Sequence, residues 1–280
     1  TDGTGPLVEL RGHQGGLSSA EFSPDGRLIV TASEDGTARV WRADGPDLPA
    51  RLPVQEGKIF SVAFSPEREH DARPASVNGT ARVWSPLIIS ASEDGAARVW
   101  PADGSSAPVV LQGHEGQVTS AAFSPDGQRI LISSRDGTAR VWRADGTGAP
   151  VVLRGHSDQV VSVAFSPDGQ RLVTVSMDGT ARVWNADGAE PLLMLRGQEE
   201  GISSAAFSPD GQGVITTSAD GSARIWPLSI SALRQALDEV NADCLPIELR
   251  RLYMDENDAV ARWKYETCEQ RHGRLSPSGR

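Results

Sequence analysis

The sequence predicts an all-β fold built from about five repeats of a small antiparallel sheet. One nine-residue stretch, SRDGTARVW at 134–142, has close copies at 33–41, 76–84, 92–100, 176–184 and 218–226. A constant spacing of 42 residues separates four of the tryptophans that end these copies, Trp100, Trp142, Trp184 and Trp226. Repeats of about 40 to 45 residues are typical of the blades of a β-propeller.

Each repeat carries signals for four short strands. In the fourth repeat, apolar and polar residues alternate at 159–165 and again at 171–176, and a third strand follows at 180–184. Asp178 and Gly179 lie between the last two runs and predict a tight hairpin, because glycine tolerates the positive φ that such turns require. The run before each Gly-His pair supplies a further short strand, which completes a four-stranded antiparallel blade.

These motifs resemble those of WD40-repeat β-propellers, and the resemblance covers residues 6–227. Gly-His, FSPDG, SxDG and the strand-ending tryptophan all occur in register, although the aspartate that usually follows the tryptophan is absent. The resemblance implies a propeller domain at 1–227, with five blades that end at Trp41, Trp100, Trp142, Trp184 and Trp226. It also implies that Leu7–Leu10 provides the outer strand of the last blade. Five blades are fewer than the typical seven, so either they close a small ring or preceding blades complete it.

Blade 2 is longer than the others, because Trp41 and Trp100 are 59 residues apart. We interpret 67–86 as an insertion, so that the strand ending near residue 66 continues at residue 87. In the alternative, 58–84 forms the blade and 87–100 is an extra hairpin. That alternative places Pro74 in a central strand, where it would remove a hydrogen-bond donor, and we favour the insertion.

After Trp226 the apolar spacing becomes helical, which predicts a three-helix tail at 228–273 and disorder at 274–280. Similar tails follow WD40 arrays in large bacterial signalling proteins. Residues 1–13 match 144–156, a segment that follows directly after a tryptophan in the repeats. We therefore expect the chain to be the C-terminal part of a longer protein, with an upstream domain in the same polypeptide.

Composition narrows the classes of partner. The net charge of −10 argues against binding nucleic acid, which requires clustered basic residues. No apolar run reaches the length of a membrane span. We therefore expect a cytoplasmic protein, in which the two cysteines of the tail, Cys244 and Cys268, are reduced thiols and not a disulfide framework.

A histidine, serine, aspartate and tryptophan recur at equivalent positions in three blades. Because they recur around a ring, they do not converge on one metal or active site. The resemblance implies instead a buried structural network in each blade, consisting of His13, Ser33, Asp35 and Trp41; His114, Ser134, Asp136 and Trp142; and His156, Ser176, Asp178 and Trp184. Gln55 and Gln198 replace the histidine in blades 2 and 5, so we expect incomplete networks there.

The positions that vary between repeats are the candidates for recognition. The residue before the hairpin aspartate changes freely, and so do the positions at the start of the first strand. In the family such positions surround one mouth of the channel, and the candidate partner-binding face consists of Glu34, Glu93, Arg135, Met177, Lys58, Phe60, Gln117, Thr119, Gln159 and Val161.

The sequence therefore favours a non-enzymatic scaffold that binds a protein or peptide, as the partner-binding or sensing part of a bacterial signalling protein. No catalytic residue, metal site or cofactor is predicted, because no nucleophile elbow, phosphate-binding loop or metal motif occurs. Two alternatives remain: a propeller enzyme with its active site in the central channel, and a degenerate repeat fragment.

Overall fold

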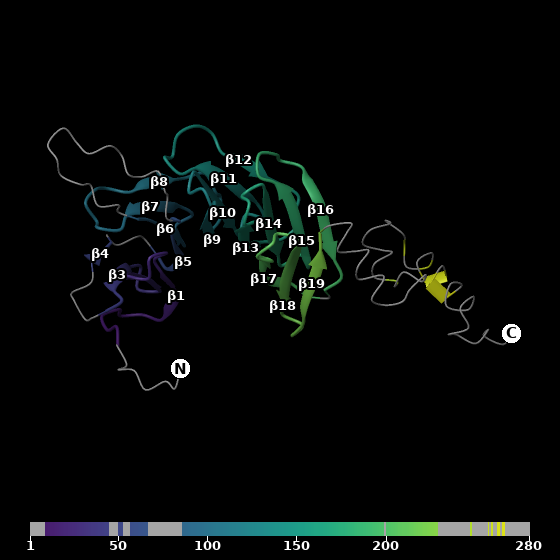
Figure 1. Cartoon of the computed structure of the whole chain (residues 1–280), viewed down its shortest axis with the longest axis horizontal. Coiled ribbons are helices and arrows are strands. Elements are labelled where there is room, and N and C mark those ends of the chain that lie inside the picture. The colour runs from purple at the N-terminus through teal and green to yellow at the C-terminus, as the bar shows by residue number, and fades with distance from the viewer. Residues whose placement is uncertain are drawn as a thin grey trace.

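The computed structural model describes residues 9–44, 50–52, 57–66, 86–198 and 200–228, together with residues 247, 257, 259, 262, 263, 265 and 266 of the tail. Within this part of the chain the strands form five antiparallel sheets, one per repeat (Figure 1). Blade 1 contains β1 (Leu17–Phe22), β2 (Leu28–Ser33), β3 (Ala38–Arg42) and β4 (Ala50–Arg51). Blade 2 contains β5 (Ile59–Phe64), β6 (Leu87–Ser92), β7 (Ala97–Pro101) and β8 (Val109–Leu111). Blade 3 contains β9 (Val118–Phe123), β10 (Arg129–Ser134), β11 (Ala139–Arg143) and β12 (Val151–Leu153). Blade 4 contains β13 (Val160–Phe165), β14 (Arg171–Ser176), β15 (Thr180–Asn185) and β16 (Pro191–Arg196). Blade 5 contains β17 (Ile202–Phe207), β18 (Gly213–Ser218) and β19 (Ala223–Pro227).

The strands of each blade pair in chain order, so each sheet is a simple antiparallel meander. In blade 4, the hairpin between β14 and β15 turns at Gly179, whose φ of 76° lies in the left-handed region. These five sheets confirm the all-β fold of repeated blades. The blade that ends at Trp226 has three strands among the described residues, where each of the other four has four.

The hydrophobic core is divided among the junctions between blades. One cluster of buried apolar side chains lies between each pair of successive blades, and both blades contribute to it. Successive side chains of a strand point to opposite faces of its sheet, so the second and third strands of blades 2, 3 and 4 contribute to the clusters on both sides. The first strands pack against one another, β1 on β5, β5 on β9, β9 on β13 and β13 on β17. First strands therefore converge on one side, and the blades follow one another around an arch that remains open in Figure 1.

The opening of the arch bears on the expected outer strand at Leu7–Leu10. Glu9 and Leu10 belong to no strand, and the two residues before them lie outside the described part. β1, which follows Glu9 and Leu10 in the chain, lies at the opposite end of the arch from β19 (Figure 1), so Glu9 and Leu10 do not complete blade 5.

The long blade 2 forms a regular sheet from segments that are distant in sequence. β5 pairs with β6, with Phe64 opposite Ile88, and the backbone N–H of Ser65 donates to the carbonyl of Leu87. The strands that flank the proposed insertion are therefore hydrogen-bonded neighbours, while 67–85 lie outside the described residues.

The predicted tail lies almost wholly outside the described residues, including Cys244, Cys268 and 274–280. The tail positions that are described at 247, 259, 262, 263, 265 and 266 are helical. The proposed boundary between propeller and tail stays a prediction.

Candidate functional site

Blade 4 shows how the repeated polar residues are connected. The Nδ1 atom of His156 lies 3.0 Å from the Asp178 carboxylate, and its Nε2 atom lies 2.8 Å from the hydroxyl of Thr174. That hydroxyl also accepts a hydrogen bond of 2.9 Å from the indole of Trp184, which is fully buried. The hydroxyl of Ser176 instead accepts the backbone N–H of Asp178. Threonine, and not the predicted serine, therefore links the histidine to the tryptophan.

The charges in this network are fixed by burial and by local donors. Burial raises the pKa of the Asp178 carboxyl, but the surrounding donors outweigh it and lower that pKa to about 2. The strongest donor is the Thr180 hydroxyl, followed by the backbone N–H of Ser157 and the His156 ring. Burial lowers the pKa of His156, and Asp178 opposes this only in part. A neutral His156 then donates from Nδ1 to the carboxylate and accepts the Thr174 hydroxyl proton at Nε2.

Blade 1 repeats the arrangement of blade 4. His13 lies 3.1 Å from Asp35 and 2.8 Å from the hydroxyl of Thr31, which accepts the indole N–H of Trp41 at 2.8 Å. The hydroxyl of Ser33 accepts the backbone N–H of Asp35, as its counterpart does in blade 4. The same chain from carboxylate to indole thus forms twice in sequence-distant blades.

Blade 3 has the complete predicted set of residues but a broken network. His114 lies 2.9 Å from Asp136, yet the position of the linking threonine is occupied by Ile132, which is fully buried. Among the described residues, the buried Nε2 of His114 and the buried indole nitrogen of Trp142 have no hydrogen-bond partner. Trp142 therefore stands outside the network that its sequence position suggests. The hydroxyl of Ser134 accepts the backbone N–H of Asp136, as its counterparts do in blades 1 and 4.

Glutamine takes the histidine position in blades 2 and 5. In blade 5, Gln198 accepts a hydrogen bond from Thr216 and donates one to Ser222, and Thr216 accepts the indole N–H of Trp226. The amide thus takes the place of the imidazole next to Thr216, but its second bond goes to the Ser222 hydroxyl, whereas the histidines of the other blades bond the hairpin aspartate. Gln55 of blade 2 lies outside the described residues.

The repeated arginine of the third strand has a role that the motif did not indicate. Arg182 donates from Nη2 to the carbonyl of Gly155 at 2.7 Å, and a Cβ atom on Gly155 would lie 2.3 Å from its Nη1. The same close approach joins Arg39 to Gly12 in blade 1. The glycine before each histidine therefore makes room for a guanidinium group. The available signal was the recurrence of the arginine in all five blades and of the glycine in four of them, with Val54 at the glycine position of blade 2.

The variable hairpin residues reach across the junctions between blades. The carboxylate of Glu34 in blade 1 lies 3.0 Å from the ammonium group of Lys58 in blade 2. The carboxylate of Glu93 accepts hydrogen bonds from the backbone of Lys58 and from the amide of Gln117 in blade 3. Met177 of blade 4 lies against Gly201 of blade 5. The structure therefore brings these predicted positions together along one rim of the arch.

Other predicted members of this face are partly used in packing. The hydroxyl of Thr119 donates to the carbonyl of Val160 in the next blade, and Val161 packs against the core cluster between blades 4 and 5. Arg135 is exposed and stacks over the ring of Phe60, with 5.9 Å between its guanidinium carbon and the ring centroid. Gln159 is half-buried beside the same rim. The side chains that a partner could contact therefore belong mainly to the hairpin residues.

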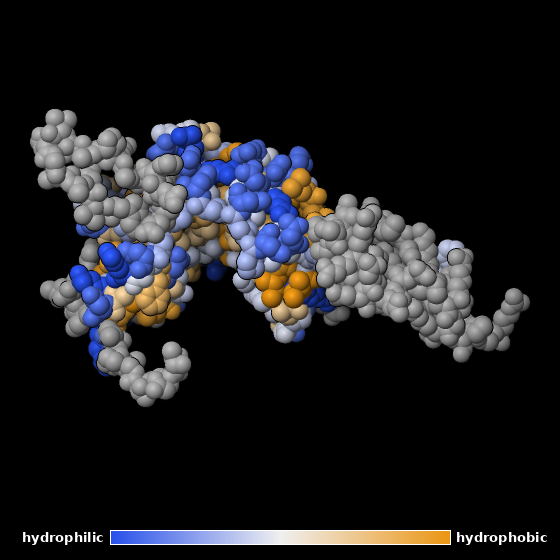
Figure 2. Space-filling model, viewed as in Figure 1, coloured by the Kyte–Doolittle hydropathy of each residue, from blue (hydrophilic) through white to orange (hydrophobic). Residues whose placement is uncertain are grey.

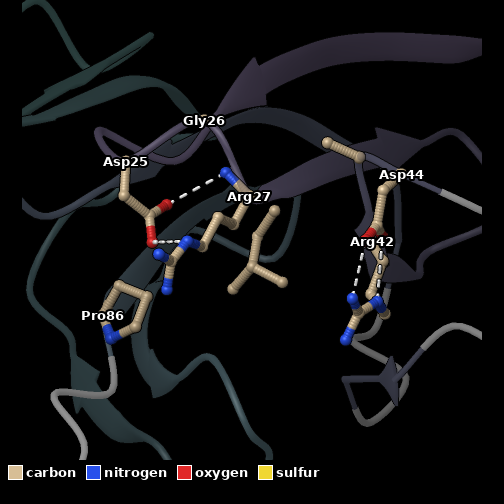
Figure 3. A pocket seen from close by; sticks show the side chains of 8 residues that line it. Asp25, Gly26, Arg27, Arg42, Asp44 and Pro86 are labelled. Carbon is tan, nitrogen blue, oxygen red and sulfur yellow. Dashed lines mark hydrogen bonds and ion pairs between the residues drawn. The ribbon is translucent and has the colours of Figure 1, made fainter.

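A pocket of about 600 Å³ opens at the junction between blades 1 and 2, away from that rim (Figure 3). Asp25 and Arg27 form one ion pair in it, Arg42 and Asp44 form a second, and Pro86 lies across from Arg27. Its acids face arginines and do not converge on a common point. Within the described residues, no group of three His, Cys, Asp or Glu side chains is placed to hold a metal ion, and no helix is long and apolar enough to span a membrane.

The family profile described as "WD domain, G-beta repeat" matches the chain at residues 4–42, 49–101, 106–143, 150–185 and 189–227. The chain belongs to the WD40 repeat family. The five matched stretches equal the five sheets in number but are offset from them by one strand: each stretch after the first begins with the fourth strand of one blade and continues through the first three strands of the next.

Several curated proteins are similar to part of these WD40 repeats. A guanine nucleotide-binding protein subunit beta of Arabidopsis thaliana is 32% identical over 131 residues, which cover 46% of this chain and 32% of that protein. An intraflagellar transport protein 80 homolog of Mus musculus is 28% identical over 42% of this chain and 18% of its own length. Telomerase protein component 1 of Mus musculus is 31% identical over 45% of this chain and 4% of its own length. The aligned region thus spans about a third or less of these relatives.

Proposed function

We propose that this chain is a non-enzymatic scaffold that binds a protein or peptide through the rim of variable hairpin residues. The observation that carries the proposal is the contrast between a repeated frame and a changing surface. Beneath each hairpin the aspartate, glycine and tryptophan recur, whereas the exposed residue above them is Glu34, Arg135, Met177 or Ala219. Acidic, basic and apolar groups on one rigid rim suit recognition of a mixed surface.

The similar proteins support this class of function. Two of their names denote parts of larger assemblies, a subunit beta and a telomerase protein component. We further propose that the chain is the partner-binding or sensing part of a longer cytoplasmic signalling protein of bacterial type, with an upstream domain in the same polypeptide. The tail resemblance and the repeat-like residues 1–13 support this finer proposal.

The proposal is tested by comparing the partners captured by charge-reversed variants. Arg135→Glu and Glu34→Lys alter the rim, while Arg143→Glu is a matched control on an exposed arginine at the far end of β11. We expect the rim variants to lose specific partners by about tenfold or more, the size of effect typical of a hot-spot arginine. The control should retain them. Identical partner sets for wild type and all three variants would contradict the proposed face.

A further inference from the structure

The two ends of the arch expose apolar faces that are buried everywhere else in the repeat. We define the leading face of a blade as the side that packs against the preceding blade, and the trailing face as the side that packs against the following blade. At one end, the leading face of blade 1 presents Leu17, Ala20 and Phe22. At the other end, the trailing face of blade 5 presents Ile215, Ala223 and Ile225. Figure 2 shows hydrophobic surface at both ends, over β1 and over β18 and β19.

The trailing face of blade 5 has the chemistry of an internal junction. Ile225 is 78% exposed, although the residues at its position in the other blades are nearly inaccessible: Val40 6%, Val99 3%, Val141 5% and Val183 2%. Ile215 is 41% exposed, and its counterparts Val30, Ile89, Leu131 and Val173 are fully buried. No following blade covers this face among the described residues, as one does at the four internal junctions.

The leading face of blade 1 is the matching half. Leu17 is 59% exposed, whereas its counterparts are buried: Ile59 0%, Val118 0%, Val160 0% and Ile202 1%. Phe22 is 61% exposed, and Phe64 at the same position of blade 2 is 5% exposed. At each internal junction, this set of residues packs into the set that blade 5 leaves open.

A missing strand pairing points in the same direction. The third strands β3, β7, β11 and β15 each pair with a fourth strand, but β19 has no described partner on its outer edge. Each of these fourth strands brings a buried leucine to an equivalent position. The leucines are Leu111, Leu153 and Leu195 in β8, β12 and β16, and Leu52 directly after β4. Leu10 occupies this place in the sequence ahead of blade 1, but it is half-buried and lies in no strand. An outer edge with no partner strand among the described residues, and a leucine outside any strand, therefore accompany the two open faces.

We propose that two copies of this chain associate head to tail, with the trailing face of blade 5 in one copy packed on the leading face of blade 1 in the other. The occupant is a second copy because the chain itself carries both halves of an interface that it already forms at four internal junctions. Residues near Leu10 of the second copy are then positioned to pair with β19 of the first. Such a contact uses two different surfaces, so a dimer leaves one face of each kind open for further copies.

The test measures the mass of the full 280-residue chain by sedimentation over a range of concentrations. Wild type should form concentration-dependent dimers and larger species. Ile225→Glu and Leu17→Glu each place an unpaired charge in the proposed interface, and each alone should weaken association by more than about tenfold. Leu192→Glu is the matched control, because Leu192 is 56% exposed on β16, away from both faces.

Mixing the two variants separates this interface from other modes of association. Ile225→Glu keeps an intact leading face and Leu17→Glu an intact trailing face, so the mixture should regain a dimer and no larger species. Circular dichroism checks that both variants remain folded, as expected for side chains exposed in the single chain. A monomeric wild type would overturn the proposal. A monomer is the result expected if the chain closes on itself or if its tail covers Ile225. A mixture that fails to dimerise, or association that survives both substitutions, would also overturn it.

Discussion

Blades 3 and 4 carry nearly the same nine-residue stretch, SRDGTARVW and SMDGTARVW, yet their interiors differ. In blade 4, hydrogen bonds run without a break from the Asp178 carboxylate to the Trp184 indole through Thr174. In blade 3 they stop at His114, because Ile132 occupies the linking position and joins the apolar cluster between blades 2 and 3. Both blades form the same four-stranded sheet, so the polar chain is not required for the blade to fold.

This difference shows which interactions the family pattern specifies. The interblade clusters are present at all four junctions and supply the dominant hydrophobic term. The polar chain adds specificity to a core that is already packed. A buried chain of hydrogen bonds lowers the stability of the fold only when one of its members is missing, because the remaining groups then lose their partners.

The largest effect should come from interrupting the chain in blade 4. Thr174→Val preserves the shape of the side chain but leaves the indole of Trp184 and Nε2 of His156 without partners. Two orphaned buried groups should lower the free energy of unfolding by roughly 2 to 4 kcal/mol. Urea unfolding followed by tryptophan fluorescence measures this. Ile132→Val is the matched control in blade 3, where only a methylene is lost and about 1 kcal/mol is expected. Equal losses in the two variants would refute the role assigned to the threonine.

The fold was predictable to the extent that it depends on local patterns. The 42-residue period and the Asp-Gly hairpins indicated the blades, and these signals act within a few residues of each turn. The open arch was not predictable, because closure depends on packing between blades 1 and 5, which are distant in sequence. The Arg182–Gly155 approach was also missed, since a motif does not reveal which of its residues touch.

The polar network was predictable in its members but not in its connections. Thr174 lies two residues before Ser176 in an alternating strand, where it reads as an ordinary strand residue. Counting His, Ser, Asp and Trp therefore placed a complete network in blade 3 and an incomplete one in blade 5. In the structure the connection is interrupted in blade 3, because Ile132 cannot form hydrogen bonds, whereas in blade 5 the Gln198 amide bonds to Thr216 and Ser222. The recognition rim was indicated by variation among repeats, and its function stays a proposal.

The next effect in size is a dependence of stability on pH that both blades share. Burial lowers the pKa of His114 and of His156 below the ordinary value of 6.5, so the unfolded chain binds protons that the folded chain does not. Stability should therefore fall as the pH drops below 6.5, by at most about 1.4 kcal/mol per pH unit for each histidine.

The carboxylates add a second loss at lower pH. The pKa of Asp136, like that of Asp178, is lowered from 3.8 to about 2 because donors outweigh burial, so their stabilisation disappears as the pH falls through that interval. Urea midpoints measured from pH 7.5 downward should show both declines. His114→Asn and His156→Asn should each flatten the first decline. If neither variant changes the slope between pH 6.5 and pH 5, the two histidines are not the groups responsible.

The smallest net effect should follow from restoring the missing link in blade 3. Ile132→Thr offers a hydroxyl that can donate to Nε2 of His114 and accept the indole N–H of Trp142, as Thr174 does in blade 4. Two new hydrogen bonds, each of about 1 kcal/mol, are offset by the loss of buried apolar volume, so stability should stay within about 1 kcal/mol of wild type. The decisive readout is hydrogen exchange at the Trp142 indole, which should slow.

In a second variant, Ile132→Thr combined with His114→Ala, the new hydroxyl loses one partner and stability should fall by more than the sum of the single changes. Additive changes would mean that the introduced hydroxyl does not connect His114 to Trp142, and that blade 3 differs from blade 4 by more than one residue.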